Sequence, residues 1–283
     1  MNKFSFSCFF VLVAIAVTNA QRPENIVTES SETTDSSIFL DDIVSRRTIL
    51  DQRVLPYESI READIPWEKR IWEVIDVREK LNFPFVNKKE PLFQILYDAA
   101  ASGSVASFAE DNFKKILQPS EIEGMMVQLD TVEVTDPVTF EVTRKPVRNE
   151  ISADNIKFFR IKEIWFFDRE SSRMKVRILG IAPIREREVA GRLEEQPMFW
   201  LYYPQLREVL AKHQAYNEFN DAAPLSWDDT FEMRRFSSYI YKESNAQDLR
   251  LKDIFPDNGV ARLRESDKIK DKLFNFEHDL WEY

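Results

Sequence analysis

The chain has 283 residues, of which 43% are hydrophobic and 31% are charged, so it is long enough to bury a sizeable core and is expected to be globular. Only 5 glycines are present, which disfavours P-loop and dinucleotide-binding folds because their phosphate loops need several glycines close together. The 39 basic and 49 acidic side chains give a net charge of −10, which disfavours non-specific binding to nucleic acid or anionic lipid.

The first 20 residues have the pattern of an export signal. Lys3 precedes an apolar run over residues 9–17, and Ala20 is a small residue at the expected cleavage site. This run is shorter than the roughly 20 residues that a membrane-spanning helix needs. We predict a cleaved signal peptide at residues 1–20, with an uncleaved N-terminal anchor as the alternative. Cys8, the only cysteine, precedes most of the apolar run, so neither a lipid anchor nor a disulfide is expected in the mature chain.

Residues 21–52 are predicted to be an acidic, Ser/Thr-rich flexible tether. Segment 28–37 contains only Ser, Thr, Asp and Glu, which offer no apolar surface to offset the entropy lost on ordering. From about Arg53 apolar positions become periodic. We therefore predict that residues 53–283 form a single α+β domain.

Two helices are predicted at the start of this domain. The first covers residues 65–82, because Asp64 can cap it, Pro66 fits its first turn, and apolar residues recur at helical spacing until Pro84. The second covers residues 91–103, between a proline that suits a helix start and a glycine that suits a helix end.

The middle of the chain changes to the pattern of strands. Residues 127–142 are rich in Val and Thr and are interrupted by Asp136-Pro137, which predicts two strands around a turn. Residues 158–167 and 173–184 are two apolar-rich runs separated by polar residues, which predicts a hairpin. Consecutive hairpins favour an α+β fold, with an antiparallel sheet of hairpins in the middle of the chain and helices before and after it.

The last third returns to helical spacing. Residues 206–213 place apolar side chains on one helix face. Ser226 and Asp229 resemble a capping box, which predicts a helix that continues to near Asn245. Ser266 is expected to cap a final helix.

Residues for catalysis or metal binding are sparse. The only histidines, His213 and His278, have no second histidine or cysteine three or four positions away, and no serine lies in a nucleophile-elbow motif. Adjacent carboxylates such as Asp228 and Asp229 suit capping and solvation better than acid–base chemistry. We therefore predict no catalytic residue, metal or cofactor. A Glu–Glu or Ser–Lys site built from distant segments leaves no local mark, so a hydrolase stays an alternative.

Clusters of aromatic residues mixed with charge are the most distinctive feature. Large aromatics and arginine are enriched at protein interfaces, so we predict that these clusters contact partners. In the helix predicted over residues 65–82, Trp72 is expected to face outward and Trp67 to join the core. The run 198–204 has a second interpretation that we favour, a central strand of the chain's own sheet. The predicted interface residues are Trp67, Arg70, Trp72, Trp200, Tyr202, Tyr203, Arg234, Arg235, Tyr239 and Tyr241.

Three of these regions together resemble a known family. Residues 57–85 (YESIREADIPWEKRIWEVIDVREKLNFPF), 199–204 (FWLYYP) and 225–245 (LSWDDTFEMRRFSSYIYKESN) resemble the signature of the gliding-motility protein GldN, called PorN in non-gliding relatives. The resemblance spans roughly residues 53–283 and supplies no catalytic residue.

Membership of this family would imply a periplasmic component of the type IX secretion system. It would form large rings with the lipoprotein GldK (PorK) beneath the outer membrane and contact the motor protein GldM (PorM). Attachment to the outer membrane would then come through the lipoprotein. A periplasmic ligand-binding module and a cell-wall hydrolase are the alternatives.

Overall fold

The computed structural model describes residues 53–135, 142–189, 192–217, 220, 223 and 225–279. All of them belong to the second of the two units into which the chain divides, residues 46–283. The helices are α1 (Leu92–Ala101), α2 (Pro119–Met125), α3 (Tyr203–Leu210), α4 (Trp227–Glu232), α5 (Leu251–Ile254) and α6 (Gly259–Asp279). Short 3-10 turns cover Glu62–Asp64, Lys80–Val86 and Ala153–Asn155.

The strands form one large sheet and two small ones. The strands of the large sheet follow the order β11-β1-β5-β6-β8-β2, and β7 pairs with the C-terminal end of β6. Every one of these pairings is antiparallel. Its members are β1 (Trp67–Asp76), β2 (Ser107–Phe108), β5 (Phe158–Asp168), β6 (Arg173–Val189), β7 (Arg192–Pro197), β8 (Trp200–Tyr202) and β11 (Tyr239–Glu243). The small sheets pair β3 (Val127–Thr135) with β4 (Val142–Glu150) and β9 (Gln214–Ala215) with β10 (Leu225–Ser226).

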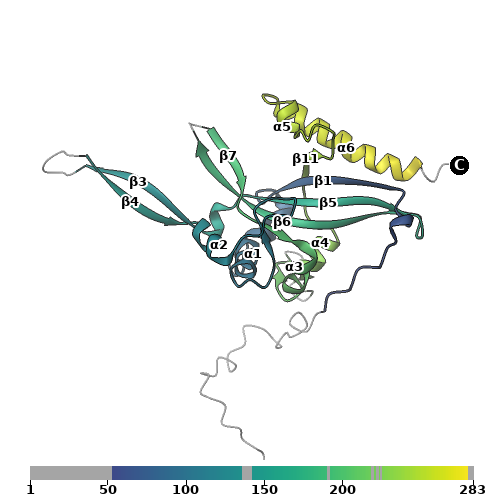
Figure 1. Ribbon diagram of the computed structural model, residues 1–283, viewed down its shortest axis with the longest axis horizontal. Helices are drawn as coiled ribbons and strands as arrows, with labels where there is room; N and C mark the ends of the chain where they lie inside the picture. The colour runs from purple at the N-terminus through teal and green to yellow at the C-terminus, as the bar shows by residue number, and fades with distance from the viewer. Residues whose placement is uncertain are drawn as a thin grey trace, which may run out of the picture. The chain divides into compact units, whose positions relative to one another are not determined.

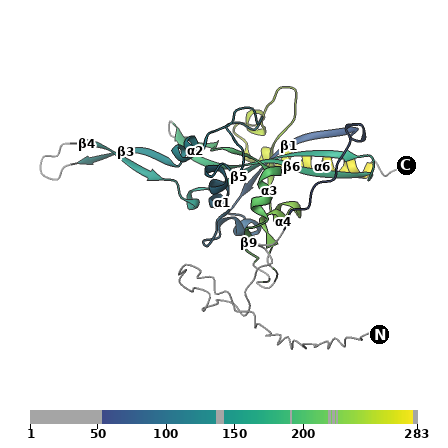
Figure 2. The ribbon, with the colours of Figure 1, turned by 60° about the horizontal axis from the view of Figure 1, so that its bottom comes forward.

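Apolar side chains bury both faces of the large sheet. Helices α1, α3 and α4 gather along one side (Figure 1), and their side chains share the main core with sheet residues such as Ile75, Phe159 and Ile161. The opposite face carries two smaller clusters, one around Trp72 and one around Val74. The β3–β4 hairpin extends away from α1 and α2 in both views (Figures 1 and 2). The α+β fold predicted from the sequence is therefore confirmed, with the antiparallel sheet in the middle of the chain.

Several local predictions are also confirmed. Helix α1 lies within residues 91–103, and β5 and β6 form the hairpin predicted from residues 158–184. The favoured interpretation of residues 198–204 holds in part, because β8 lies between β6 and β2 but ends at Tyr202, where α3 follows. Strand β3 covers the first strand predicted within residues 127–142, but β4 begins only at Val142, where the second was expected to end, and runs to Glu150. The turn predicted at Asp136-Pro137 lies outside the described residues.

The helix predicted over residues 65–82 is wrong, because residues 67–76 form strand β1. From Ile71 to Ile75 every side chain is buried, whichever face of the sheet it points to. A strand buried on both faces loses the alternation that identifies strands, and its apolar residues then fit helical spacing by chance. Its β-branched and aromatic composition, with Ile71, Trp72, Val74 and Ile75, suits a strand.

The helix predicted from Ser226 to near Asn245 is correct only at its start. The capping box of Ser226 and Asp229 is present, but α4 ends at Glu232. Arg234 adopts a left-handed conformation with φ of 51°. Its N–H donates to the carbonyl of Phe231, and the next N–H donates to the carbonyl of Thr230. This is the Schellman pattern that ends helices, and an arginine gives no sequence signal for it because glycine is the usual residue there.

The last helix begins earlier than predicted. Helix α6 starts at Gly259, so Ser266 lies inside it instead of capping it. The apolar side chains of Ile269 and Leu273 pack against Ile71 and Ile240. Within the described part of the chain, no helix has the length and apolar character needed to cross a membrane.

Candidate binding site at the sheet edge

Three of the predicted interface residues are buried in the chain's own core. Trp72, Trp200 and Tyr203 are 6%, 3% and 0% exposed. Trp72 and Trp200 belong to one cluster, and the ring of Tyr203 packs edge-on against Phe231. The prediction that Trp72 faces outward is therefore wrong, because both faces of β1 are covered at this position.

Two further aromatic residues are half-buried. Trp67 stacks on Phe276 of α6 with 4.6 Å between ring centroids, and Tyr202 contacts Phe113 edge-on at 5.6 Å. Trp67 and Trp72 lie five positions apart in a strand, so they point to opposite faces of the sheet. The expected opposition of the two tryptophans holds, but strand geometry causes it.

Two of the predicted basic residues are exposed. Arg70 lies 3.6 Å from the carboxylate of Glu68. Arg235 borders a largely apolar groove of about 280 Å³ together with Leu81 and Tyr216. These side chains remain available to a partner.

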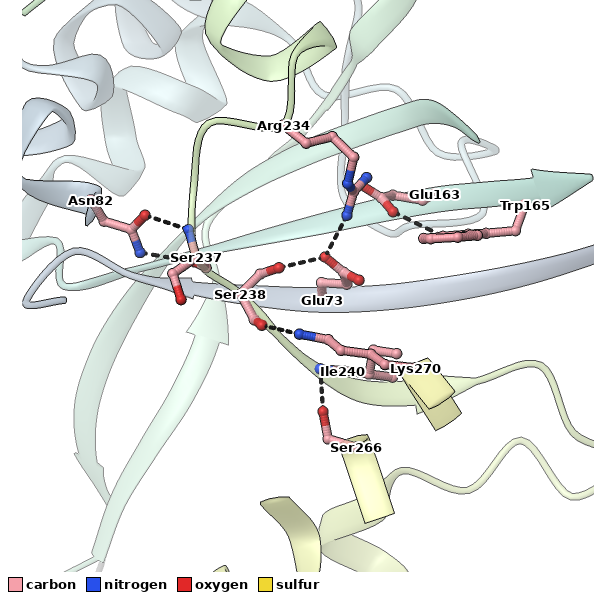
Figure 3. Close-up of polar contacts among 10 residues, drawn as sticks. All are labelled: Glu73, Asn82, Glu163, Trp165, Arg234, Ser237, Ser238, Ile240, Ser266 and Lys270. Carbon is pink, nitrogen blue, oxygen red and sulfur yellow. Dashed lines mark hydrogen bonds and ion pairs between the residues drawn. The ribbon is translucent and has the colours of Figure 1, made fainter. Parts of the chain in front are cut away.

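Arg234 instead joins two strands of the sheet through a buried pair of carboxylates (Figure 3). Its Nη1 donates to Glu163 Oε1 at 2.6 Å, and its Nη2 donates to Glu73 Oε2 at 3.2 Å. Glu73 of β1 and Glu163 of β5 are only 1% and 0% exposed. Trp165 Nε1 donates to the second oxygen of Glu163 at 3.1 Å. We call the set of Arg234, Glu73 and Glu163 the carboxylate clamp.

The clamp holds two acidic side chains against one basic one. The pKa of Glu163 is raised to about 7, mainly by burial and also by the nearby charge of Glu73, while Arg234 opposes both effects. A buried charge without a partner costs several kcal/mol, so the guanidinium of Arg234 is needed to keep the carboxylates in place. Arg234 reaches both carboxylates from the left-handed position that follows α4.

The segment that enters β11 is fixed next to the clamp. Asn82 both donates to the carbonyl of Ser237 and accepts from its N–H, each at 2.8 Å. The hydroxyl of Ser238 donates to Glu73 Oε2 at 2.6 Å. Figure 3 shows these bonds on either side of the strand start.

Helix α6 covers the outer edge of β11. The N–H of Ile240 donates to the hydroxyl of Ser266 at 2.8 Å, and Lys270 Nζ donates to the carbonyl of Ser238 (Figure 3). An unpaired strand edge is a template for pairing with another chain, and covering it with a helix removes that template. The position of β11 is thus set from the sheet and from the helix.

Tyr239 and Tyr241 point to the face opposite Ile240, in the alternation of a strand. Both line a hollow of about 530 Å³ that also includes Arg160, Arg250 and Arg262, which we call the β11 hollow. Burial raises the pKa of each tyrosine to about 12. Both phenols therefore remain protonated and can donate hydrogen bonds at neutral pH.

Of the predicted interface residues, Tyr239 and Tyr241 line this hollow, whereas Arg234 and Arg235 do not. The arginines of the hollow come instead from β5, from the position just before α5 and from α6. The clamp carboxylates were not predicted from the sequence. One signal was available for Glu163, since it is a charged residue inside the apolar run 158–167 and turns out to be fully buried. Nothing in the sequence pairs it with Glu73.

The fold and this site define an α+β protein in which a braced edge strand presents aromatic side chains to a basic hollow. In the described residues, no group of three or more His, Cys, Asp or Glu side chains could hold a metal ion. Residues 60–282 match the family model of the gliding motility associated protein GldN. The chain therefore belongs to the GldN family. No curated protein matched it.

Proposed function

We propose that this protein is a non-enzymatic structural subunit of the periplasmic ring of the type IX secretion system. In this proposal it assembles with a GldK/PorK-type lipoprotein and with neighbouring copies of itself, and it contacts the periplasmic part of a GldM/PorM-type motor protein. Secretion and gliding motility would both require it. The match of residues 60–282 to the GldN family is the observation that supports this assignment.

The proposal also assigns a location. The export pattern of residues 1–20 directs the chain to the periplasm, and the lipoprotein partner holds it at the outer membrane. The partner contacts would come from the predicted aromatic and basic interface residues that are not buried in the chain's own core. These are Arg70, Arg235, Tyr239 and Tyr241, with the half-buried Trp67 and Tyr202.

A cell-wall hydrolase is the alternative function to weigh against the carboxylate clamp, because such enzymes use pairs of carboxylates. Glu73 and Glu163 form a pair of carboxylates assembled from distant segments, and the pKa of Glu163 is near neutral. However, both side chains are almost completely buried, and each is bonded to Arg234. A substrate would have to reach groups that face no open surface, so we interpret the clamp as structural.

The experiment that tests the proposal is isolation of this protein from cells of its source by a tag at the C-terminus. After mild detergent extraction, we expect it in a very large ring-shaped particle together with a lipoprotein. Images of the particle give its symmetry. A free monomer in the same extract would contradict the proposal and favour a ligand-binding module.

A second measurement concerns protein levels. When a subunit lacks its partners, the apolar surface that they would cover is exposed to solvent, which promotes aggregation and proteolysis. Deletion of the lipoprotein gene should therefore lower the amount of this protein in cells, and restoring the gene should restore it. An undiminished monodisperse monomer in the deletion strain would count against a ring subunit.

A further inference from the structure

The β11 hollow contains a buried cation that lacks part of its bonding. Arg160 is only 7% exposed, and its Nε has no hydrogen-bond partner in the described part of the chain. Its guanidinium lies over the ring of Tyr241 at 4.9 Å, and its Nη2 is 3.6 Å from Glu195 of β7. A buried donor without an acceptor is rare in native proteins and costs free energy, so it needs an explanation.

Two more arginines converge on the same hollow from the helices. Arg250 precedes α5, and Arg262 lies in the first turn of α6. Neither guanidinium forms an ion pair with another described residue. The hydroxyls of Tyr239 and Tyr241 are likewise without a hydrogen bond to any residue that the structure describes. Donors from three arginines and two tyrosines therefore surround a space that offers them few acceptors.

The acidic residues at the hollow do not supply those acceptors. Asp253 accepts the backbone N–H of Arg250 at 3.0 Å, which caps α5. Glu195 reaches Arg160 only at the long distance of 3.6 Å, and Glu194 beside it is exposed. Because the chain as a whole carries a charge of −10, a hollow in which three arginines meet and two of them have no ion pair with a described residue is a local exception to its electrostatics.

We propose that the β11 hollow binds a carboxylate side chain from an acidic segment of a partner protein. Arg250 and Arg262 form the ion pairs, and the tyrosine hydroxyls donate to the same carboxylate. A single negative charge fits better than a phosphate, because Glu194 and Glu195 would repel a doubly charged group more strongly. This inference rests on the proposed function, since it assigns one of the surfaces through which the subunit assembles.

The bracing of β11 gives the site its rigidity. The carboxylate clamp and the bonds from Ser266 and Lys270 fix the strand that carries both tyrosines. A preorganised site loses less free energy on ordering when the ligand arrives. The hollow is therefore suited to recognition of a specific acidic residue and not only to general attraction.

Binding to the purified full-length mature chain tests the proposal. The probe is an acetylated peptide with three glutamates spaced by glycines, compared with the same peptide carrying glutamines and with inorganic phosphate. Calorimetry should detect the glutamate peptide, with an affinity that falls as salt is added. The double variant Arg250→Gln/Arg262→Gln should bind it roughly tenfold more weakly or worse, since loss of one member of an interfacial charge pair weakens binding.

Arg264→Gln is the matched control, because Arg264 is an exposed arginine of α6 that does not line the hollow. This variant should bind the glutamate peptide as tightly as the unmodified chain does. Both Arg264→Gln and the double variant should have the melting temperature of the unmodified chain. Equal binding by the double variant would overturn the inference, as would equal binding of the glutamine peptide, tighter binding of phosphate, or no binding of the glutamate peptide at millimolar concentration.

The cellular particle separates this inference from the proposed function. If the unmodified chain forms the particle but the double variant enters it to the same extent at every salt concentration, the hollow is not a partner site and the ring proposal stands. If the unmodified chain forms no particle, the ring proposal fails whatever the peptide binds. We expect the double variant to dissociate from the particle at a lower salt concentration than the Arg264→Gln variant does.

Discussion

The hydroxyl of Ser266 accepts the backbone N–H of Ile240 at 2.8 Å, and through this bond a helix closes the edge of the main sheet. The bond is buried and joins α6 to β11 across 26 positions of sequence. It explains why a serine lies on the face of α6 that otherwise carries apolar residues.

Replacement of Ser266 by alanine should destabilise the protein. The change leaves the Ile240 N–H buried without an acceptor, which costs about 1–3 kcal/mol. Urea unfolding should show this loss, and the less tightly covered edge should increase aggregation. Lys268→Ala, on the exposed side of the same helix, should change stability by less than about 0.5 kcal/mol. Equal effects of the two changes would contradict the role of Ser266.

Arg234 and Arg235 are neighbours with opposite roles, so their alanine variants should differ. Arg234→Ala leaves Glu73 and Glu163 buried without a cation and should cost about 3–5 kcal/mol of folding stability. Arg235→Ala removes an exposed side chain and should cost less than about 0.5 kcal/mol. Chemical denaturation measures both values. Adding Glu73→Gln and Glu163→Gln to the Arg234→Ala variant should recover part of the loss, and failure of that rescue would mean that the clamp does not act through charge.

The raised pKa of Glu163 predicts a specific pH dependence. In the folded protein this carboxyl holds its proton up to a pH of about 7, whereas in the unfolded chain it releases the proton near its ordinary pKa of 4.5. Between these values the folded state binds more protons, so stability decreases as pH rises through the window, by about 1.4 kcal/mol for each unit of pKa difference.

Glu163→Gln should remove this contribution, because glutamine keeps an acceptor for Arg234 but cannot ionise. Melting temperatures between pH 4.5 and 7.5 should decrease less steeply for this variant than for the unmodified chain. Glu68→Gln, at an exposed position of β1, serves as the control and should follow the unmodified chain. Parallel curves for all three proteins would exclude Glu163 as the titrating group.

The two tryptophans of β1 should respond differently to truncation. Trp72 is buried, its Nε1 donates to Asp111 at 2.7 Å, and Lys242 lies 4.5 Å from its ring centre, so Trp72→Ala should cost about 3–5 kcal/mol. Trp67 is half-buried and stacks on Phe276, so Trp67→Ala should cost less and mainly loosen the C-terminal part of α6. Hydrogen exchange would locate that loosening, and an identical loss of global stability in both variants would contradict this assignment.

Local sequence patterns determined several features of this protein. The capping box at Ser226, the helix at residues 91–103 and the hairpin over residues 158–184 depend on neighbours in the chain, and all three are present. The three family-like segments indicated the GldN family, which the match over residues 60–282 then showed.

Only the tertiary structure decided what β1, β11 and the residues around them do. Residues 67–76 and 239–243 fit helical spacing in the sequence, but pairing with β5 and with one another makes them strands. The clamp joins Glu73, Glu163 and Arg234, which are separated by 90 and 71 positions in the chain. Their partnership depends on strand register and on a left-handed residue at the end of α4, because burial and charge pairing act across space and leave no periodic trace in the sequence.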